Sequence, residues 1–121
     1  MNKKVLIIDD NKSDLICLTI ALKELGYSDI FQAETGEAGV ETCRTQQPDI
    51  VILDTVLPQM NGFETCQQIK KLPGKKPIVV LLTGQPDAVS AGLAREAGAD
   101  KYTIKTSSYE EFKKCVRTLI V

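Results

Sequence analysis

Short, unbroken runs of apolar residues alternate with longer amphipathic segments along the chain. The three strongest runs are Val5–Ile8, Ile50–Leu53 and Ile78–Leu82, and two weaker runs are Ile30–Ala33 and Lys101–Ile104. The strong runs consist of Val, Ile and Leu without polar alternation, which is typical of strands buried on both faces of a parallel sheet. The pattern therefore predicts five β-strands.

The segments between these runs have helical periodicity. In the first segment, apolar residues recur at helical spacing until Gly26, which favours the end of a helix. Thr35 is a suitable N-cap for the second helix, and the third begins near Gly62 and ends before Pro73. The apolar positions of the first helix are Leu15, Leu18, Leu22 and Leu25.

Two further helices complete the pattern. The fourth runs from about Asp87 to Ala97 and is stopped by Gly98. The start of the last helix has two candidate capping boxes, which are Ser108 with Glu111 and Ser107 with Glu110. Its apolar face consists of Tyr109, Phe112, Val116 and Leu119.

A strand followed by a helix, five times over, predicts right-handed β-α-β units in an α/β fold. The parallel sheet of such a fold is covered by helices on both faces. No linker, low-complexity run or internal repeat interrupts the 121 residues. We therefore expect residues 1–121 to form one domain.

Composition and charge exclude several classes of protein. Apolar residues make up 43% of the chain and charged residues 26%, and the formal net charge is −1. That balance does not favour direct binding to nucleic acid or to an anionic membrane. No apolar stretch approaches the ~18 residues of a spanning helix, and the apolar run at the N-terminus is too short for a signal peptide. We expect a cytoplasmic protein.

The chain has no histidine and four scattered cysteines. Mixed Cys/His zinc sites are therefore excluded, and the chain cannot be a histidine phosphodonor. Each cysteine falls in a helical segment, where we expect it to be a small, buried apolar residue rather than a redox group. The four are Cys17, Cys43, Cys66 and Cys115.

Polar side chains that can bind ligands or take part in a reaction follow the ends of the predicted strands. Asp9 and Asp10 follow the first strand, Asp54 the third, Thr83 the fourth and Lys105 the fifth. In open α/β sheets, ligand sites lie beyond the carboxyl ends of the strands. Each residue alone has an ordinary alternative: a helix cap for either acid of the pair, a turn for Asp54, a solvated surface for Lys105. Together they predict a site.

The residue types at this site suit phosphoryl transfer. Crowded carboxylates repel one another, and a hard divalent cation with oxygen ligands, such as Mg²⁺, relieves that repulsion. A carboxylate can act as the nucleophile and form an aspartyl phosphate. Lys105 would balance the charge of the acceptor and then of the phosphoryl oxygens, and the Thr83 hydroxyl could donate a hydrogen bond to one of them.

These residues belong to short motifs that follow one another in a specific order and spacing. In these motifs the chain resembles the receiver domains of two-component response regulators over essentially its whole length. The resemblance implies a flavodoxin-like (βα)5 three-layer sandwich with a five-stranded parallel sheet of order 2-1-3-4-5. The motifs are Val5-Leu6-Ile7-Ile8-Asp9-Asp10, Asp54 with Leu57-Pro58 and Met60-Asn61-Gly62, Leu82-Thr83-Gly84, Ala97-Gly98-Ala99-Asp100, and Lys105.

The resemblance also implies a role for each site residue. Asp54 would accept a phosphoryl group from a sensor histidine kinase or a histidine phosphotransfer protein, and Lys105 would bond to that group. Thr83 and Tyr102 would form the switch pair, although Tyr102 by itself is more typical of a half-buried strand. Mg²⁺, or Mn²⁺ as a substitute, would be held directly by Asp10, through water by Asp9, by Asp54, and by the backbone carbonyl of Val56.

On this interpretation the chain is a signalling domain and not an enzyme beyond its own phosphorylation and slow autodephosphorylation. Its conformational change would regulate an effector protein or an output domain. Ile16 and Ile20 lie off the apolar stripe of the first helix. They predict either a broadly buried helix or a docking surface for the phosphodonor.

Two positions depart from the family pattern. Thr106 follows Lys105 where family members usually have proline, and a cis bond there would cost about 2.5–4 kcal/mol, so we expect it to be trans. Gln85-Pro86 makes the loop after Thr83 unusual. The alternative function is a degenerate receiver that binds partners without phosphorylation. A flavin-binding protein of the same architecture would need a loop rich in Ser, Thr or Gly after the first strand, and an aspartate-nucleophile phosphatase would need a D-x-D pattern there, and the segment after Ile8 has neither.

Overall fold

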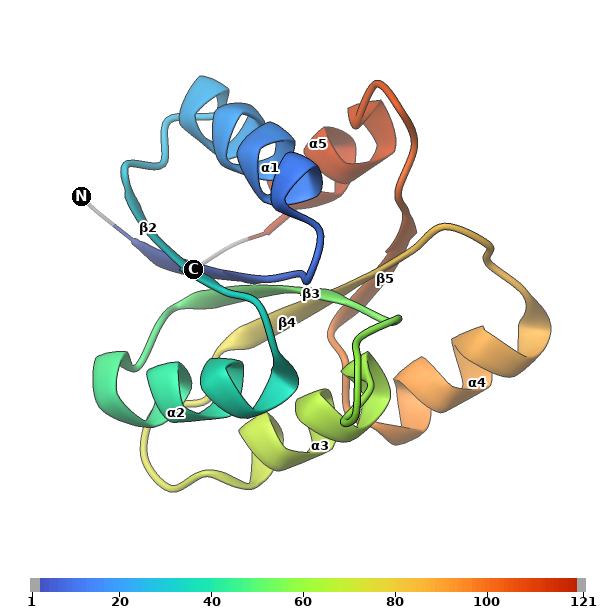
Figure 1. Ribbon diagram of the computed structural model, residues 1–121. Coiled ribbons are helices and arrows are strands. Elements are labelled where there is room, and N and C mark those ends of the chain that lie inside the picture. The colour runs from blue at the N-terminus through green and yellow to red at the C-terminus, as the bar shows by residue number, and fades with distance from the viewer. Residues whose placement is uncertain (1–2, 120–121) are drawn as a thin grey trace.

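The computed structural model, which describes residues 3–119, contains a single parallel sheet (Figure 1). The strand order is β2-β1-β3-β4-β5, which confirms the order implied by the family resemblance. In chain order the strands are β1 (Lys4–Ile8), β2 (Asp29–Ala33), β3 (Ile50–Asp54), β4 (Ile78–Thr83) and β5 (Lys101–Ile104).

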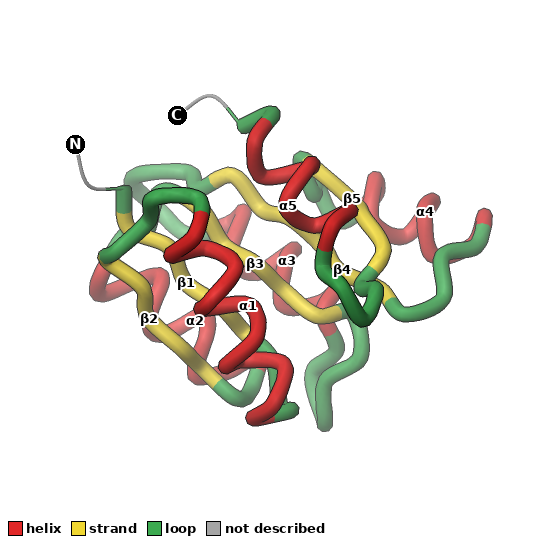
Figure 2. The backbone as a smooth tube through the Cα atoms, turned by 90° about the horizontal axis from the view of Figure 1, so that it is seen from above, coloured by secondary structure: helices red, strands yellow, loops and turns green. Residues whose placement is uncertain are grey.

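Helices cover both faces of this sheet and make the three layers of the predicted sandwich. Two of them, α1 and α5, lie on one face, and the other three lie on the opposite face (Figures 1 and 2). None of the helices within residues 3–119 is long and apolar enough to cross a membrane. The helices are α1 (Lys12–Glu24), α2 (Gly36–Gln46), α3 (Gly62–Lys71), α4 (Ala88–Glu96) and α5 (Glu110–Arg117).

The apolar runs are continuous because successive strand residues enter two different cores. In β1, Leu6 and Ile8 pack beneath α2 and α3, while Val5 and Ile7 pack beneath α1 and α5. All four side chains are fully buried. The same alternation in β3 and β4 leaves no strand position for a solvated side chain until each strand ends. The site residues lie at those ends.

The helix starts fit most of the sequence predictions. Thr35 accepts a hydrogen bond from the backbone N–H of Ala38 and caps α2, and Asp87 caps α4 in the same way. The first helix is capped by Asn11, whose side chain accepts from the N–H of Asp14. Neither Asp9 nor Asp10 is therefore used as a helix cap, and both carboxylates are available to the site.

The predicted start of the last helix is wrong. Neither capping box forms, and α5 begins after Tyr109, which has a left-handed backbone (φ 59°) and no side-chain cap. The backbone N–H of Tyr109 instead donates to the carbonyl of Thr106 at 3.1 Å, which closes a tight turn ahead of the helix. The Tyr109 ring packs against the core beneath α1 and α5, and this tertiary contact overrides the serine caps.

The cysteine prediction is right for two residues and wrong for a third. Cys43 and Cys66 are buried, whereas Cys17 is exposed and Cys115 is half-buried. Cys17 lies two residues after Leu15, about 200° around α1, so it points away from the sheet. Burial raises the pKa of the Cys43 thiol to about 12 and that of Cys66 to about 11, which keeps both thiols protonated at neutral pH.

Candidate functional site

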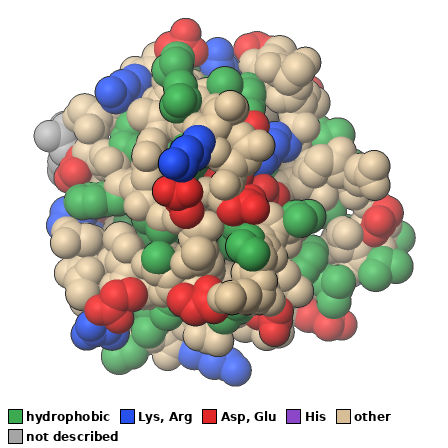
Figure 3. Space-filling model, viewed as in Figure 1, with side chains coloured by type: hydrophobic (Ala, Val, Ile, Leu, Met, Phe, Trp, Pro, Cys, Tyr) green, Lys and Arg blue, Asp and Glu red, His purple; other side chains and the backbone are tan. Residues whose placement is uncertain are grey.

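The predicted acids meet at the carboxyl end of the sheet because β1 and β3 are neighbours. Ile8 pairs with Leu53, so the residues that follow these two strands, Asp9 and Asp54, lie side by side. One carboxylate oxygen from each of Asp9, Asp10 and Asp54 lies within 4.8 Å of the other two. Asp9 is fully buried, Asp54 is half-buried and Asp10 is exposed, so the cluster opens to solvent on one side. Acidic side chains gather near the middle of the face in Figure 3.

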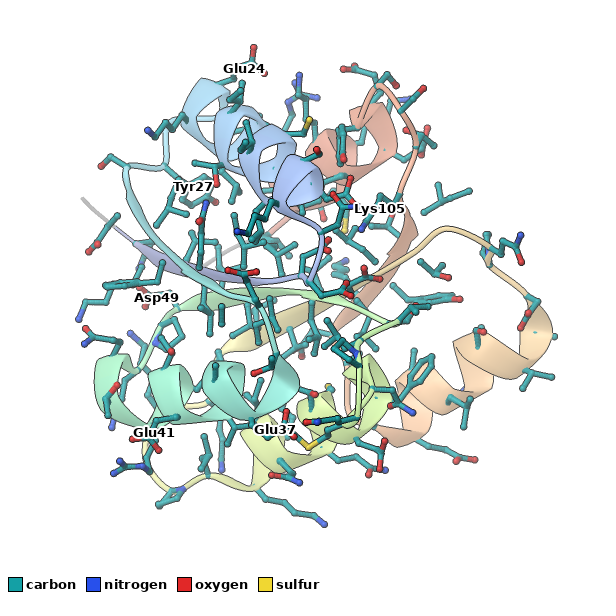
Figure 4. The ribbon with its side chains drawn as sticks, viewed as in Figure 1. Glu24, Tyr27, Glu37, Glu41, Asp49 and Lys105 are labelled. Atoms are coloured by element: carbon teal, nitrogen blue, oxygen red, sulfur yellow. The ribbon has the colours of Figure 1, made fainter. Side chains whose placement is uncertain are left out.

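Lys105 places its ammonium group among these carboxylates. Its backbone N–H donates to the carbonyl of Thr83 at 2.7 Å, which extends the pairing of β5 with β4 to the site. Its Nζ lies 2.7 Å from Oδ2 of Asp9, 2.9 Å from Oδ2 of Asp14 and 3.1 Å from Oδ2 of Asp54. The side chain lies between the start of α1 and the end of β5 (Figure 4). Lys105 is therefore paired with the acids of the candidate site and is not a solvated surface lysine.

Burial and hydrogen bonding shift the pKa values of the charged residues at the site in opposite directions. Burial of Asp9 raises the pKa of its carboxyl, and this outweighs the hydrogen bonds from Lys105 and from the backbone of Asn11. Burial acts to lower the pKa of Lys105, but hydrogen bonds to Asp9 and Asp14 and the charge of Asp54 raise it well above its usual range. The lysine is thus held as an ammonium ion that balances part of the negative charge.

A tight loop holds Asp54 in position after β3. The backbone N–H of Val56 donates to Oδ1 of Asp54 at 3.2 Å, and the N–H of Gly62 donates to the carbonyl of Thr55 at 3.0 Å. A Cβ atom on Gly62 would lie 2.1 Å from the backbone oxygen of Asp54, so only glycine permits this close approach. The Val56 side chain is 75% exposed.

Thr83 lies at the end of β4, the neighbour of β3 in the sheet, and Tyr102 lies on β5, the next strand. Thr83 is buried at the end of β4, and its hydroxyl accepts a hydrogen bond from the N–H of Gln85 at 3.2 Å. Tyr102 pairs with Leu81 and packs against the core beneath α3 and α4. Its hydroxyl is buried and has no hydrogen-bond partner among the described residues.

Sequence reasoning missed two residues that contact the site. The Asp14 carboxylate accepts from Lys105 through Oδ2 and from the Tyr109 hydroxyl through Oδ1, at 2.8 Å for the latter. Burial acts to raise the pKa of Asp14, but these two hydrogen bonds hold it below its ordinary value. Neither contact had a signal in the sequence, because Asp10 precedes α1 and both Lys105 and Tyr109 precede α5, so helical spacing relates neither pair.

Two remaining predictions concern the surroundings of the site. Ile16 and Ile20 on α1 are 59% and 53% exposed, which excludes the alternative of a broadly buried helix. No peptide bond among residues 3–119 is cis, so the Lys105–Thr106 bond is trans as expected.

Comparison with known proteins agrees with this geometry. The family model described as response regulator receiver domain matches residues 5–117. The chain is 34% identical over 120 residues to the alkaline phosphatase synthesis transcriptional regulatory protein PhoP of Bacillus subtilis, a match that covers 99% of this chain and 49% of PhoP. The chain spans about half the length of the curated relatives it matches.

Solved structures show the same fold. The BeF3-activated receiver domain of DrrB from Thermotoga maritima superimposes with a TM-score of 0.82 at 32% identity, covering 97% of this chain and 96% of that one. The receiver domain of the histidine kinase CKI1 from Arabidopsis thaliana, complexed with Mg²⁺, gives a TM-score of 0.82 at 26% identity over 95% of this chain and 90% of that one. The chain therefore belongs to the response regulator receiver domain family.

Proposed function

We propose that residues 1–121 form one receiver domain whose Asp54 accepts a phosphoryl group from a phosphohistidine. A carboxylate oxygen of Asp54 attacks phosphorus, and the bond between phosphorus and the imidazole nitrogen breaks. The electron pair of that bond stays on the imidazole, which takes up a proton, and an aspartyl phosphate forms. The observation that carries this proposal is the convergence of Lys105, Asp9 and Asp10 on Asp54 at the open end of the sheet.

The donor set at this end fits Mg²⁺. Carboxylates of Asp9, Asp10 and Asp54 lie close enough to share one small, hard cation, and an exposed edge leaves room for the waters that Mg²⁺ retains. The family resemblance adds the backbone carbonyl of Val56, with Mn²⁺ as a substitute. When bound, the cation supplies positive charge that screens the acids and the phosphoryl oxygens. The receiver domain of CKI1, itself complexed with Mg²⁺, supports this assignment.

Lys105 and Thr83 provide the remaining contacts to the phosphoryl group. The Lys105 ammonium, 3.1 Å from Oδ2 of Asp54, is positioned to follow the negative charge from the carboxylate to the phosphoryl oxygens. The buried hydroxyl of Thr83 donates to one of those oxygens after it leaves the N–H of Gln85. The family resemblance assigns Thr83 and Tyr102 to the switch pair, in which the hydroxyl turns toward the phosphoryl group and the ring moves inward.

The partners follow from this chemistry. The phosphodonor is a sensor histidine kinase or a histidine phosphotransfer protein, which docks on the exposed Ile16 and Ile20 of α1. An effector protein or an attached output domain reads the phosphorylated state. The domain itself works in the cytoplasm without contacting nucleic acid or membrane, in line with its net charge of −1.

Incubation with Mg²⁺ and acetyl phosphate, followed by intact mass, tests this function. We expect one phosphoryl adduct on the wild-type chain and none on the Asp54→Asn variant. The adduct should also fail to form when Mg²⁺ is removed with EDTA. An adduct that survives Asp54→Asn, or a wild-type chain that forms none, would overturn the proposal and favour a receiver that binds partners without phosphorylation.

A further inference from the structure

Asp14 links the lysine of the site to the start of α5. Its Oδ2 lies 2.9 Å from Nζ of Lys105, and its Oδ1 accepts the hydroxyl of Tyr109 at 2.8 Å. Asp14 belongs to the first turn of α1 and is not one of the three acids that cluster at the end of the sheet. It therefore interacts with the site through Lys105.

Lys105 has no spare hydrogen for a new acceptor. An ammonium group has three donors, and Asp9, Asp14 and Asp54 use all of them. A phosphoryl oxygen can take the place of the Asp54 carboxylate oxygen, and a second contact to the phosphoryl group must displace one of the other two carboxylates. Asp9 is almost completely buried and Asp54 carries the phosphoryl group itself, whereas the side chain of Asp14 is 28% exposed and can be solvated by water. Asp14 is the partner that can be exchanged.

Tyr109 ties this exchange to the last helix. It is the N-cap of α5, its left-handed backbone lacks a capping side chain, and its hydroxyl is bonded to Asp14. Its backbone N–H donates to Thr106, so only a tight turn separates it from Lys105. A change in the hydrogen bond between Lys105 and Asp14 therefore affects the hydrogen bond between Asp14 and Tyr109, the N-cap residue of α5.

We propose that Asp14 and Tyr109 are positioning residues for Lys105. In the unphosphorylated domain the ammonium group of Lys105 contacts both Asp14 and Asp54. In the phosphorylated domain it contacts the phosphoryl group in place of Asp14. Tyr109 orients Asp14 and carries the exchange to the start of α5. This inference rests on the proposed phosphorylation of Asp54. It adds a second conformational response to phosphorylation, at the start of α5, separate from that of Thr83 and Tyr102.

Fluorine NMR of the chain labelled with 3-fluorotyrosine tests the exchange. The sequence has three tyrosines, Tyr27, Tyr102 and Tyr109, so three resonances are expected and the Tyr109→Phe variant assigns one of them. Beryllofluoride with Mg²⁺ serves as the phosphoryl mimic. We expect saturation to shift the Tyr109 resonance while Tyr27 stays in place. In Asp14→Asn, Tyr109 should start near the shifted position and move little.

Affinity for beryllofluoride gives a second readout. Asp14→Asn and Tyr109→Phe should each change the dissociation constant by about two- to fivefold, and the double variant should match Asp14→Asn because both act through one contact. Glu24→Gln is the matched control: it also removes a negative charge from α1, at the end far from Lys105 (Figure 4), and should leave the constant unchanged.

The outcomes separate this inference from the proposed function. If acetyl phosphate modifies Asp54 but saturating beryllofluoride leaves Tyr109 unmoved, the positioning role is overturned and the phosphoacceptor stands. Additive effects of the two variants would also overturn it. If no tyrosine responds and no adduct forms, the proposed function fails, and the positioning role fails with it.

Discussion

Nζ of Lys105 lies 2.7 Å from Oδ2 of Asp9, a carboxylate with 1% of its side chain exposed. A buried carboxylate without a partner is costly, and burial has already raised the pKa of Asp9. The lysine that we propose to bind the phosphoryl group therefore also compensates the charge of the buried acid. On this proposal, phosphorylation and stability depend on the same ion pair.

Lys105→Met should destabilise the domain in metal-free buffer. The substitution keeps most of the side-chain volume but leaves Asp9 and its neighbours without the ammonium group, a loss of about 3 kcal/mol for a buried pair that loses one partner. Urea unfolding at neutral pH measures the change. Added Mg²⁺ should recover part of it, because the cation replaces some of the missing positive charge.

Lys113→Met is the matched control for that experiment. Lys113 pairs with Glu24 at 2.9 Å, but the Glu24 side chain is 58% exposed, so water screens the pair. We expect a change between 0 and about 1 kcal/mol and no response to Mg²⁺. Equal losses for the two lysine variants would contradict a special role for the buried pair.

Mg²⁺ should stabilise the wild-type domain through the acidic cluster. At a concentration 100 times the dissociation constant, a ligand that binds only the folded state adds about 2.7 kcal/mol to the free energy of unfolding. Asp10→Asn should abolish most of this gain and, without metal, should unfold at a higher temperature than wild type because one of the crowded charges is gone. Thermal unfolding with Mg²⁺ and with EDTA measures both effects.

A substitution at the other end of the sheet provides the control for the metal. Asp29 begins β2 and pairs with Lys4, far from the carboxyl ends of the strands. Asp29→Asn should keep the full response to Mg²⁺. A wild-type melting temperature that does not change with Mg²⁺ would exclude the proposed metal site. So would an Asp10→Asn variant whose melting temperature rises with Mg²⁺ as much as that of the wild type.

The parts of this structure that could be predicted from sequence are those fixed by periodicity and strand ends. A parallel sheet covered on both faces requires continuous apolar strands, so Val5–Ile8 and Ile50–Leu53 can be recognised as strands from the sequence. The residues after them then meet at one edge because β1 and β3 pair in register. The strand order came from the family resemblance.

The parts that could not be predicted depend on contacts between helices. Whether Tyr109 reaches Asp14 depends on how α5 packs beside α1, and local spacing does not specify that packing. The packing of the Tyr109 ring against the core, which replaces the serine caps expected for α5, likewise depends on tertiary structure. The exposure of Cys17 was predictable in principle, because its position two residues after Leu15 places it on the opposite side of α1.

The stability contributed by Asp49 should depend on pH. Burial acts to raise its pKa, but hydrogen bonds from the Lys75 side chain and the Lys4 backbone, together with nearby positive charge, hold the pKa below its ordinary value. A lowered pKa in the folded state gives stabilisation that is full above the unfolded value of about 4 and is lost as the pH falls through the folded value. The Lys4 bond measures 2.7 Å.

Asp49→Asn isolates that contribution. At neutral pH we expect the variant to be less stable than wild type by about 1 kcal/mol, the range of a hydrogen bond to a charged group after partial compensation by the amide. The difference should shrink below about pH 4, where the wild-type carboxyl also becomes neutral. Urea unfolding of both proteins across this range checks it. A difference that grows on acidification would contradict the assigned direction.

Thiol labelling should distinguish docking from chemistry. Cys17 is exposed on α1 between Ile16 and Ile20, whereas Cys43 and Cys66 are buried and their raised pKa values keep them protonated. A maleimide at neutral pH should therefore modify Cys17 first, with half-buried Cys115 slower, and intact mass after proteolysis should locate the label. Cys17→Ser should remove the fast reaction.

The labelled domain then tests the α1 surface directly. A bulky maleimide on Cys17 should slow phosphoryl transfer from a phosphohistidine protein, because we propose that this donor docks beside the exposed Ile16 and Ile20. Acetyl phosphate needs no such surface, so its adduct on Asp54 should form at the unmodified rate. The Cys17→Ser variant carried through the same treatment controls for damage by the reagent. Equal inhibition with both donors would mean that the label disturbs the site, and no inhibition with the protein donor would exclude α1 as the docking surface.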